Sequence, residues 1–244
     1  MSFKIDKYFR PIALPEIVLG IIPIIITVLF SCCSPRDESI DDYLESLPKV
    51  DDAEGNSYPY IELFGKYWFV TNLKTTLFND TTTIPHIVID EQWGSTDNAA
   101  FCWYNNNPEM ANTYGALYNW HAVNSGKLCP QGWRVPTEED WQQLIDSLGG
   151  EKVAGGKLKI KGTEFWEGNN NGASNSSGFR ALPGGYRNLS GEFKHLGEYG
   201  FWWSSSVFDD NNAWYRSLYY YSERTYRNYF RKTIGYSVRC VKDK

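Results

Sequence analysis

One apolar run, residues 17–30, divides this chain of 244 residues into two unequal parts. Three basic residues precede the run, namely Lys4, Lys7 and Arg10. A helix of about 14 residues is too short to cross roughly 30 Å of hydrocarbon, and Pro23 disfavours a stable helix there. This length and these flanks are typical of a signal peptide. We therefore expect residues 1–31 to be removed during export, with an uncleaved anchor helix as the alternative.

The four residues at 29–32, Leu-Phe-Ser-Cys, resemble a bacterial lipobox. In such a motif an aliphatic residue, a tolerated residue and a small residue precede the cysteine that receives the lipid. The resemblance predicts lipidation of Cys32, with Cys33 as a poorer alternative because it would place Cys32 at the small-residue position. Acyl chains such as palmitate hold a protein on a bilayer through buried methylene groups. We expect an exported outer-membrane lipoprotein at the cell surface, with the membrane as its partner.

An acidic segment follows the cysteine pair and predicts a spacer. Residues 37–54 hold eight acidic side chains against Lys49 alone. Such a segment has little apolar surface to bury and repels itself, so we expect residues 32–50 to form an unfolded tether. Residues 51–244 then make one domain of about 190 residues, enough for a single core. The formal net charge of −5 argues against nucleic acid as a partner.

The domain contains three cysteines in what we expect to be an oxidising compartment, where a disulfide is the default. Alternation over residues 234–240 places Cys240 on the face that should be buried, and Cys129 begins a loop before a helix. We predict a Cys129–Cys240 disulfide, which would stabilise the fold by roughly 4–5 kcal/mol. Cys102 could replace one of the two. No CxxC and no His/Cys cluster points to structural zinc.

The patterning of the domain predicts an α+β fold with a mainly antiparallel sheet. Residues 58–73 should form a hairpin that turns at Gly65-Lys66. The clearest helix is 137–148, with Thr137 as its N-cap and Asp140 completing a capping box. Residues 114–123 are ambiguous between strand and helix, and 169–178 form a polar loop. Further strands are expected at 101–104, 201–204, 213–222, 226–230 and 234–241.

Several motifs, in this order, resemble the Fibrobacter succinogenes major paralogous domain from about residue 51 to 242. They lie at 52–58, 65–73, 102–106, 114–120, 126–137, 181–187, 201–205 and 236–241. That family occurs as surface or secreted modules, often on lipoproteins. More distantly, residues 129–141 are similar to the formylglycine-generating or sulfatase-modifying enzymes. The resemblance implies a C-type-lectin-like fold with one or two helices and long loops, and it implies no established activity.

The sequence offers no catalytic or metal-binding constellation. Formylglycine-generating enzymes use two cysteines late in the domain that bind copper, whereas residues 211–241 contain only Cys240. We therefore expect no enzyme activity and no cofactor. His86, His121 and His195 are far apart and are interpreted as packed or surface residues. The tripeptides that hold calcium in lectins are absent from the sequence. Residues 209–212 are interpreted as a hairpin turn. A bound structural calcium ion is kept as an alternative.

Aromatic side chains are the remaining signal, because Phe, Trp and Tyr make up 16% of the chain. Alternation over 213–222 puts aromatic rings on both faces of one strand, so one face can expose a row of tyrosines. Aromatic planes stack on sugar rings or protein partners, while Arg and Asn supply hydrogen bonds. The candidate ligand-binding residues are Tyr186, Trp214, Tyr215, Arg216, Tyr219, Tyr221, Tyr226, Arg227 and Asn228. The alternative is that these rings build the core, as we expect for Trp202 and Trp203.

These observations favour a lipid-anchored binding or adhesion module that recognises glycan or protein through its C-terminal half. A structural envelope lipoprotein without a soluble ligand is the second hypothesis. An oxidative enzyme related to the formylglycine generators is the third, and it would require a second free thiol beside Cys240.

Overall fold

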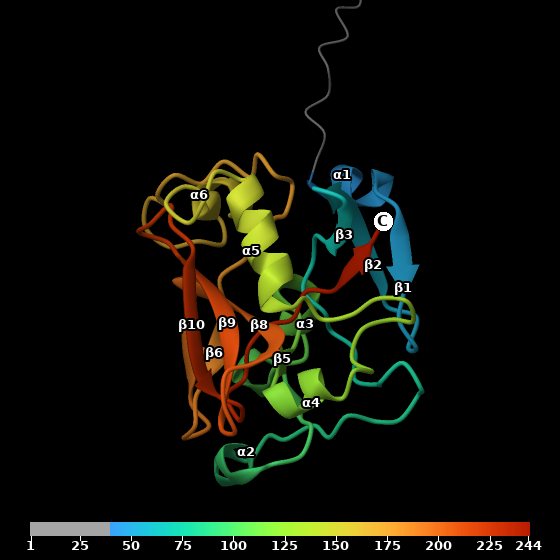
Figure 1. Ribbon diagram of the computed structural model, residues 1–244. Coiled ribbons are helices and arrows are strands. Elements are labelled where there is room, and N and C mark those ends of the chain that lie inside the picture. Colours follow the sequence, from blue (N-terminus) through green and yellow to red (C-terminus); the bar gives the residue numbers. More distant parts are fainter. Residues whose placement is uncertain (1–39) are drawn as a thin grey trace, which may run out of the picture. The chain divides into compact units, whose positions relative to one another are not determined.

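The computed structural model describes residues 40–244 (Figure 1), and the predicted signal peptide and Cys32 lie outside this range. The described chain is built from antiparallel strand pairs and short helices, so the α+β prediction is confirmed. None of the helices in this range has the length and apolar character needed to cross a membrane.

The first sheet joins the two ends of the domain. Its strands run in the order β1 (Lys49–Asp51), β2 (Ser57–Leu63), β3 (Lys66–Phe69) and β11 (Val241–Asp243). The turn between β2 and β3 confirms the predicted hairpin, and its Gly65 has a φ of 81°, which glycine adopts at no steric cost. Because β11 pairs with β3, the end of the chain returns to its first hairpin (Figure 1).

The tether prediction was wrong for residues 40–50, because the folded domain begins inside the predicted spacer. Residues Ile40–Ser46 form helix α1, and β1 pairs with β2 so that Val50 lies opposite Tyr58. Val50 packs against the main hydrophobic cluster, whereas its neighbours Lys49 and Asp51 are exposed. The tether was predicted from the overall acidic composition of the segment. That composition does not show that one apolar residue faces the core while the charged residues on either side face water.

The second sheet is rich in aromatic residues. Its strands are β8 (Tyr199–Val207), β9 (Asn212–Tyr219) and β10 (Tyr226–Arg231), in the order β10-β9-β8 and all antiparallel. The three strands predicted in this region are therefore confirmed. Asp209 accepts hydrogen bonds from the backbone N–H groups of Asn211 and Asn212, both at 2.8 Å, as expected for a hairpin turn.

Two further strand pairs lie beside these sheets, namely β4 (Phe101–Cys102) with β5 (Leu117–Tyr118) and β6 (Gly184–Arg187) with β7 (Phe193–Leu196). The strand predicted at 101–104 is shorter than expected. The ambiguous segment 114–123 contains both elements, since α4 follows β5 directly. The remaining helical elements are α2 (Asp90–Ser95), η1 (Tyr104–Asn106), α3 (Met110–Tyr114), α4 (Trp120–Asn124) and α6 (Ala154–Leu158).

Helix α5 (Glu138–Ser147) confirms the clearest sequence prediction, including the capping box of Thr137 and Asp140. Figure 1 shows it between the two larger sheets. Its apolar face belongs to a cluster that includes Trp68 of β3 and Trp202 of β8. The ring centroids of Trp141 and Trp68 lie 5.0 Å apart, so α5 links the two sheets through aromatic packing.

The C-terminal segment differs from the predicted strand at 234–241. Only Val241–Asp243 form a regular strand, and residues 234–238 instead run between elements with single bridges to Arg187, Tyr118 and Trp202. The predicted burial of residues 234, 236, 238 and 240 is confirmed, but the opposite face is buried as well. Because both sides of this segment are buried, the alternation in its sequence does not distinguish a buried face from an exposed one.

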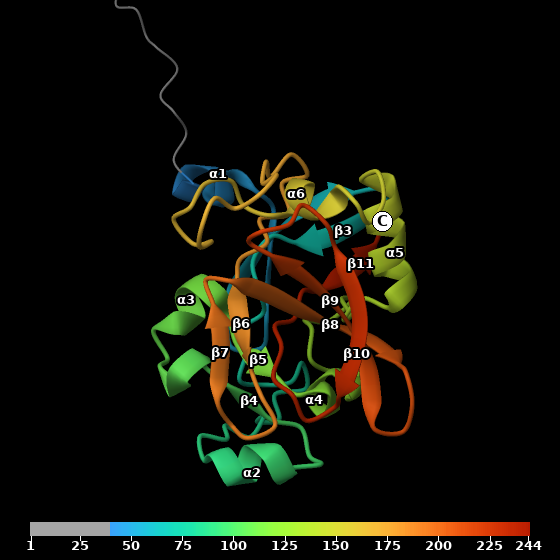
Figure 2. The ribbon, with the colours of Figure 1, turned by 90° about the vertical axis from the view of Figure 1, so that its left-hand side faces the viewer.

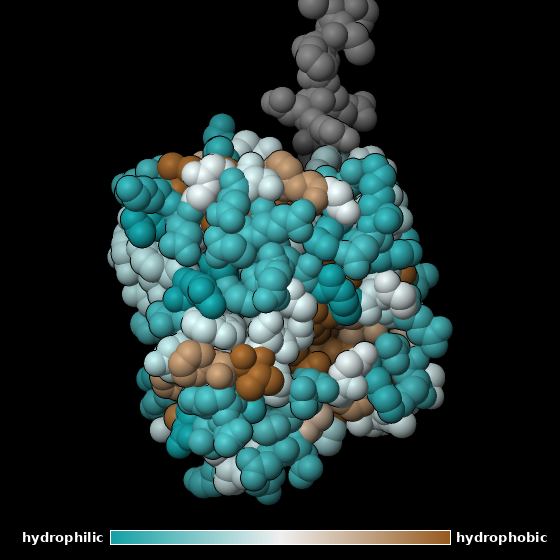
Figure 3. All heavy atoms as spheres, in the orientation of Figure 1, coloured by the Kyte–Doolittle hydropathy of each residue, from teal (hydrophilic) through white to brown (hydrophobic). Residues whose placement is uncertain are grey.

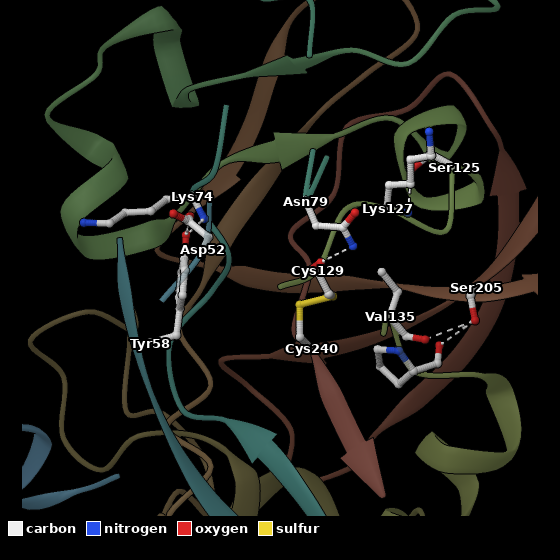
Figure 4. Close-up of a disulfide and its surroundings, with 11 residues drawn as sticks. Asp52, Tyr58, Lys74, Asn79, Ser125, Lys127, Cys129, Val135, Ser205 and Cys240 are labelled. Atoms are coloured by element: carbon white, nitrogen blue, oxygen red, sulfur yellow. Dashed lines mark hydrogen bonds between the residues drawn. A yellow bond between two sulfur atoms is a disulfide. The ribbon is translucent and has the colours of Figure 1, made fainter. Parts of the chain in front are cut away.

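The predicted disulfide between Cys129 and Cys240 is confirmed, with a Cα–Cα distance of 5.9 Å (Figure 4). Asn79 donates a hydrogen bond of 3.0 Å to the carbonyl of Cys129, which fixes the loop before α5. Cys102 is buried and free, so the alternative pairing is wrong. The bridge spans 111 residues and ties the end of the chain to its middle.

Candidate functional site

The second sheet, the β6–β7 pair and residues 234–236 line an open hollow of about 210 Å³ with aromatic walls. Figure 2 shows β6 and β7 beside the second sheet. The rim and walls of the hollow include Tyr186 of β6, His195 of β7, Tyr199 and Phe201 of β8, and Tyr219 of β9. Tyr215, Phe230, Ile234 and Tyr236 complete the lining.

Strand register explains why these rings meet. Tyr199 lies opposite Tyr219 and Trp203 lies opposite Tyr215 in the β8–β9 pair. Alternate residues of a strand share one face, so the tyrosines of β9 point to the same side as Tyr199, Phe201 and Trp203 of β8. The β6–β7 pair brings Tyr186 to within 5.1 Å of Phe201, measured between ring centroids, and closes that side of the hollow.

The floor of the hollow is formed by two buried phenols. The rings of Tyr215 and Tyr236 lie 4.8 Å apart, and both residues are at least nine-tenths buried. Burial raises the pKa of Tyr215 to about 12 and that of Tyr236 well above its ordinary value. Both hydroxyls are therefore neutral at physiological pH and can donate or accept a hydrogen bond.

Two sets of stacked rings form the rim. In one set His195 lies between Tyr186 and Tyr199, at centroid distances of 5.8 and 4.4 Å. In the other, Tyr219 stacks on Tyr226 at 4.6 Å and on Tyr221 at 5.5 Å. These rings present flat faces and polar edges beside an apolar interior, an arrangement suited to a ligand with the same two properties.

His195 occupies a constrained position in this rim. Its φ of 60° is uncommon for a residue other than glycine, and its Nδ1 atom lies 2.5 Å from Oε2 of Glu198. Such backbone strain persists only where the surrounding structure holds it, and it is frequent at binding sites. The sequence prediction treated His195 as a packed or surface residue, whereas here its ring is a wall of the hollow.

A buried lysine holds the backbone that carries Tyr219 and Tyr221. Lys159 donates hydrogen bonds to the carbonyls of Tyr219 and Ser222 at 3.0 and 2.9 Å, and to that of Asn171 at 2.9 Å. Burial lowers the pKa of Lys159 to about 8. These contacts fasten the predicted polar loop, which contains Asn171, to the end of β9 and fix the backbone on either side of Tyr221.

The predicted ligand-binding residues divide between the two faces of the sheet. Tyr186, Tyr215 and Tyr219 line the hollow, and Tyr221 and Tyr226 stack beside it. Tyr215, however, is only 8% exposed and belongs to the floor, so it is not part of an exposed row. Asn228 is exposed on β10 and does not line the hollow.

The opposite face of the sheet holds Trp214, Arg216 and Arg227 in a separate cluster. Arg216 is 3% exposed and pairs with the carboxylate of Glu138 at the start of α5, so it is not available to a ligand. Arg227 lies 3.1 Å from the same carboxylate and 3.9 Å from the ring centre of Trp214. Burial raises the pKa of Glu138 although both arginines oppose this shift. This cluster packs α5 against β9.

Tyr199 and Phe201 also line the hollow, but the sequence analysis did not assign them to the site. Their alternation with Trp202 was a usable signal, because it places them on one face of β8. The β6–β7 pair that covers this face was not predicted as a strand pair, because it lies in a Gly-rich segment without a clear alternating pattern. Trp202 and Trp203 are buried, as predicted.

Three other hollows of the described residues lack this combination of aromatic walls and polar groups. One, of about 320 Å³, mixes acidic and basic side chains such as Asp97 and Arg231. Another, of about 220 Å³, lies between β2 and α3. A third lies above the disulfide, with Val123, Leu128 and Val135 in its walls. Figure 3 shows the molecule from the side seen in Figure 1, where a hydrophobic hollow interrupts a largely hydrophilic surface.

Reactive and metal-binding groups are not gathered at any of these places. Within residues 40–244, no group of three or more His, Cys, Asp or Glu side chains could hold a metal ion. Burial raises the pKa of the Cys102 thiol to about 12, which keeps it protonated and unreactive. The other two domain cysteines are joined to each other.

The fold and the hollow define a disulfide-bonded α+β domain with an open aromatic hollow on one face of its second sheet. Residues 61–242 match the sequence model of the Fibrobacter succinogenes major domain, so the chain belongs to that family. No curated protein and no solved structure matches the chain.

Proposed function

We propose that this protein is an exported, lipid-anchored binding module whose aromatic hollow takes a neutral glycan. The observation that supports a neutral ligand is the chemistry of the lining, in which no Asp, Glu, Lys or Arg side chain takes part. A sugar ring offers apolar faces for stacking and hydroxyls for hydrogen bonds, and the rim tyrosines and buried phenols match both.

A C-type-lectin-like fold is part of this proposal. Its support is the pairing of the first hairpin with the last strand and the packing of α5 against both larger sheets. The oxidative-enzyme alternative is disfavoured because Cys240 is bonded to Cys129 and the remaining thiol, Cys102, lies buried in another cluster.

Glycan-array binding by the full chain in detergent tests the hollow. Replacing both Tyr219 and Tyr221 with alanine removes two rim rings, and we expect at least a roughly tenfold loss of affinity. The matched control is Tyr229→Ala, because Tyr229 is 44% exposed on the opposite face of the same sheet. Tyr215 is unsuitable because its removal would open a cavity in the floor.

The outcomes separate a glycan ligand, a protein ligand and a structural envelope role. Loss of glycan binding in the double variant, with normal binding in Tyr229→Ala, supports the proposal. Capture of a protein ligand that depends on the same two tyrosines would show that the ligand is a protein. If the double variant binds glycan like the parent, or if the parent binds nothing, the glycan proposal fails and a structural envelope role is favoured.

Lipid attachment is tested separately. Metabolic labelling with palmitate should mark the parent protein and leave Cys32→Ser unlabelled, and fractionation should find the parent with the outer membrane. Equal labelling of both proteins would contradict lipidation at Cys32.

A further inference from the structure

The two edges of the β10-β9-β8 sheet differ in how they are covered. At the β8 edge, the N–H of Ser237 donates to the carbonyl of Phe201 and the N–H of Trp203 donates to the carbonyl of Ser237, both at 3.1 Å. At the β10 edge, no described residue outside β9 forms a hydrogen bond with the backbone of residues 226–230. One edge is therefore closed by the chain itself and the other is open.

Strand β10 lacks the bulges and prolines that usually prevent an open sheet edge from pairing with another strand. Its pairing with β9 is continuous from Tyr226 to Arg231, without a bulge, and it contains no proline. Figures 1 and 2 both show β10 on the outside of the molecule, with no element beside its outer edge. The outward N–H and C=O groups of a strand of this kind can pair with another extended chain.

Charge determines which chain can pair there. Residues 222–232 hold Arg224, Arg227, Arg231 and Lys232 against Glu223, a net charge of +3 in a protein of net charge −5. Within the described residues Arg231 forms no ion pair, and its side chain is exposed. Two copies of β10 would repel each other, whereas an acidic strand would be attracted.

Apolar surface beside the edge favours an extended partner. Tyr229 and Phe230 are 44% and 43% exposed and lie on opposite faces of the sheet. A strand added to β10 would place alternate side chains over both faces and would cover part of each ring.

We propose that β10 is a docking edge for an acidic, extended peptide segment of a partner protein, which adds to the sheet as a fourth strand. Main-chain hydrogen bonds supply affinity, the exposed Arg231 selects acidic side chains, and the two exposed rings cover apolar ones. This edge adjoins the glycan hollow, because Phe230 also belongs to the lining of that hollow. The two tests use different residues, namely Tyr219 and Tyr221 for the hollow and Arg231 for the edge.

Fluorescence anisotropy with the full chain in detergent tests the charge requirement. The probes are a labelled peptide of alternating Glu and Val and its counterpart of alternating Lys and Val. We expect the Glu peptide to bind at least about tenfold more tightly and to weaken as salt rises. Equal binding of the two peptides would overturn the proposal.

Two N-methylated Glu-Val peptides test the backbone requirement. Methylation of alternate residues leaves one edge of the peptide able to pair, and this probe should still bind. Methylation of every residue keeps the charges and side chains but removes all N–H donors, and it should abolish binding. If the fully methylated peptide binds like the parent peptide, strand addition is excluded.

A pair of charge reversals locates the site. Arg231→Glu should weaken binding of the Glu peptide by about tenfold, whereas Lys242→Glu, an equal change at an exposed position of β11, should leave it unchanged. Equal effects of the two reversals would place binding elsewhere. Self-association of the parent that Arg231→Glu removes, without peptide binding, would show pairing between copies instead.

Discussion

At the residue scale, the most constrained side chain is Arg239. It is fully buried and donates hydrogen bonds to Asn72 Oδ1 at 2.7 Å and to the carbonyls of Phe69, Phe179 and Arg180 at 2.7, 3.0 and 3.0 Å. Burial lowers the pKa of the guanidinium well below its ordinary value. One planar group thus satisfies acceptors from two segments that lie far apart in the sequence, residues 69–72 and 179–180.

We expect Arg239→Met to lower the free energy of unfolding by about 3 kcal/mol, because buried acceptors lose their donors. Arg239→Lys should recover little, since an ammonium group cannot reproduce the planar fork. Urea unfolding measures the effect, with the exposed Arg231→Met as the control that should change stability by less than about 0.5 kcal/mol. A loss below about 1 kcal/mol in Arg239→Met would show that the carbonyls find other partners.

The same scale shows how far the site could be predicted. Alternation along 213–222 correctly indicated a strand with aromatic residues on both faces, and it included Tyr219 and Tyr221. It could not show that residues 234–236 would cover Tyr215 or that Glu138 would pair with Arg216. Both partners lie far away in sequence, so the burial of these two residues depends on tertiary packing that no local pattern encodes.

At the element scale, the start of α5 depends on Asp140. Its carboxylate accepts hydrogen bonds from the N–H of Thr137 at 2.7 Å and from Arg134 Nη2 at 3.1 Å. Burial acts to raise the pKa of Asp140, but these hydrogen bonds outweigh it and lower the pKa to about 2. Because the folded pKa lies below the ordinary value of 3.8, this stabilisation is complete above pH 3.8 and is lost as pH falls towards 2.

Asp140→Asn should therefore lower the free energy of unfolding by about 1–2 kcal/mol at neutral pH, and the difference from the parent should vanish near pH 2. Denaturant unfolding at several pH values measures this difference. Glu139→Gln is the matched control, because Glu139 is exposed in the same helical turn. A difference that stays constant down to pH 2 would show that the charge of Asp140 is not responsible.

Elements with strong local signals were predictable, and elements defined by their neighbours were not. Helix α5 has its own cap and apolar face, and the β2–β3 hairpin has its own glycine turn. By contrast, residues 234–240 are enclosed on both sides, so their pattern suggested a longer regular strand than exists. Strand β1 forms only because β2 offers an edge to pair with, which explains why its acidic surroundings pointed to a tether.

At the scale of the whole molecule, both long-range ties involve the last few residues. Strand β11 completes the first sheet, and Cys240 joins the end of the chain to Cys129 just before α5. Between these ties and the second sheet lies Tyr236, which forms part of the floor of the hollow. The position of the floor therefore depends on how firmly the C-terminal segment is held.

Replacing both Cys129 and Cys240 with alanine should lower the free energy of unfolding by about 4 kcal/mol, because the bridge closes a loop of 111 residues. The loss appears as a lower urea midpoint for the double variant. Reducing agent provides the matched control, since it should bring the parent to the same midpoint and leave the double variant unchanged. At urea concentrations well below that midpoint, the free energy of glycan binding should fall by less than the free energy of unfolding. The reason is that β8 still pairs with Ser237 and holds Tyr236 over the sheet. Complete loss of binding in a folded double variant would instead mean that the disulfide itself positions the floor of the hollow.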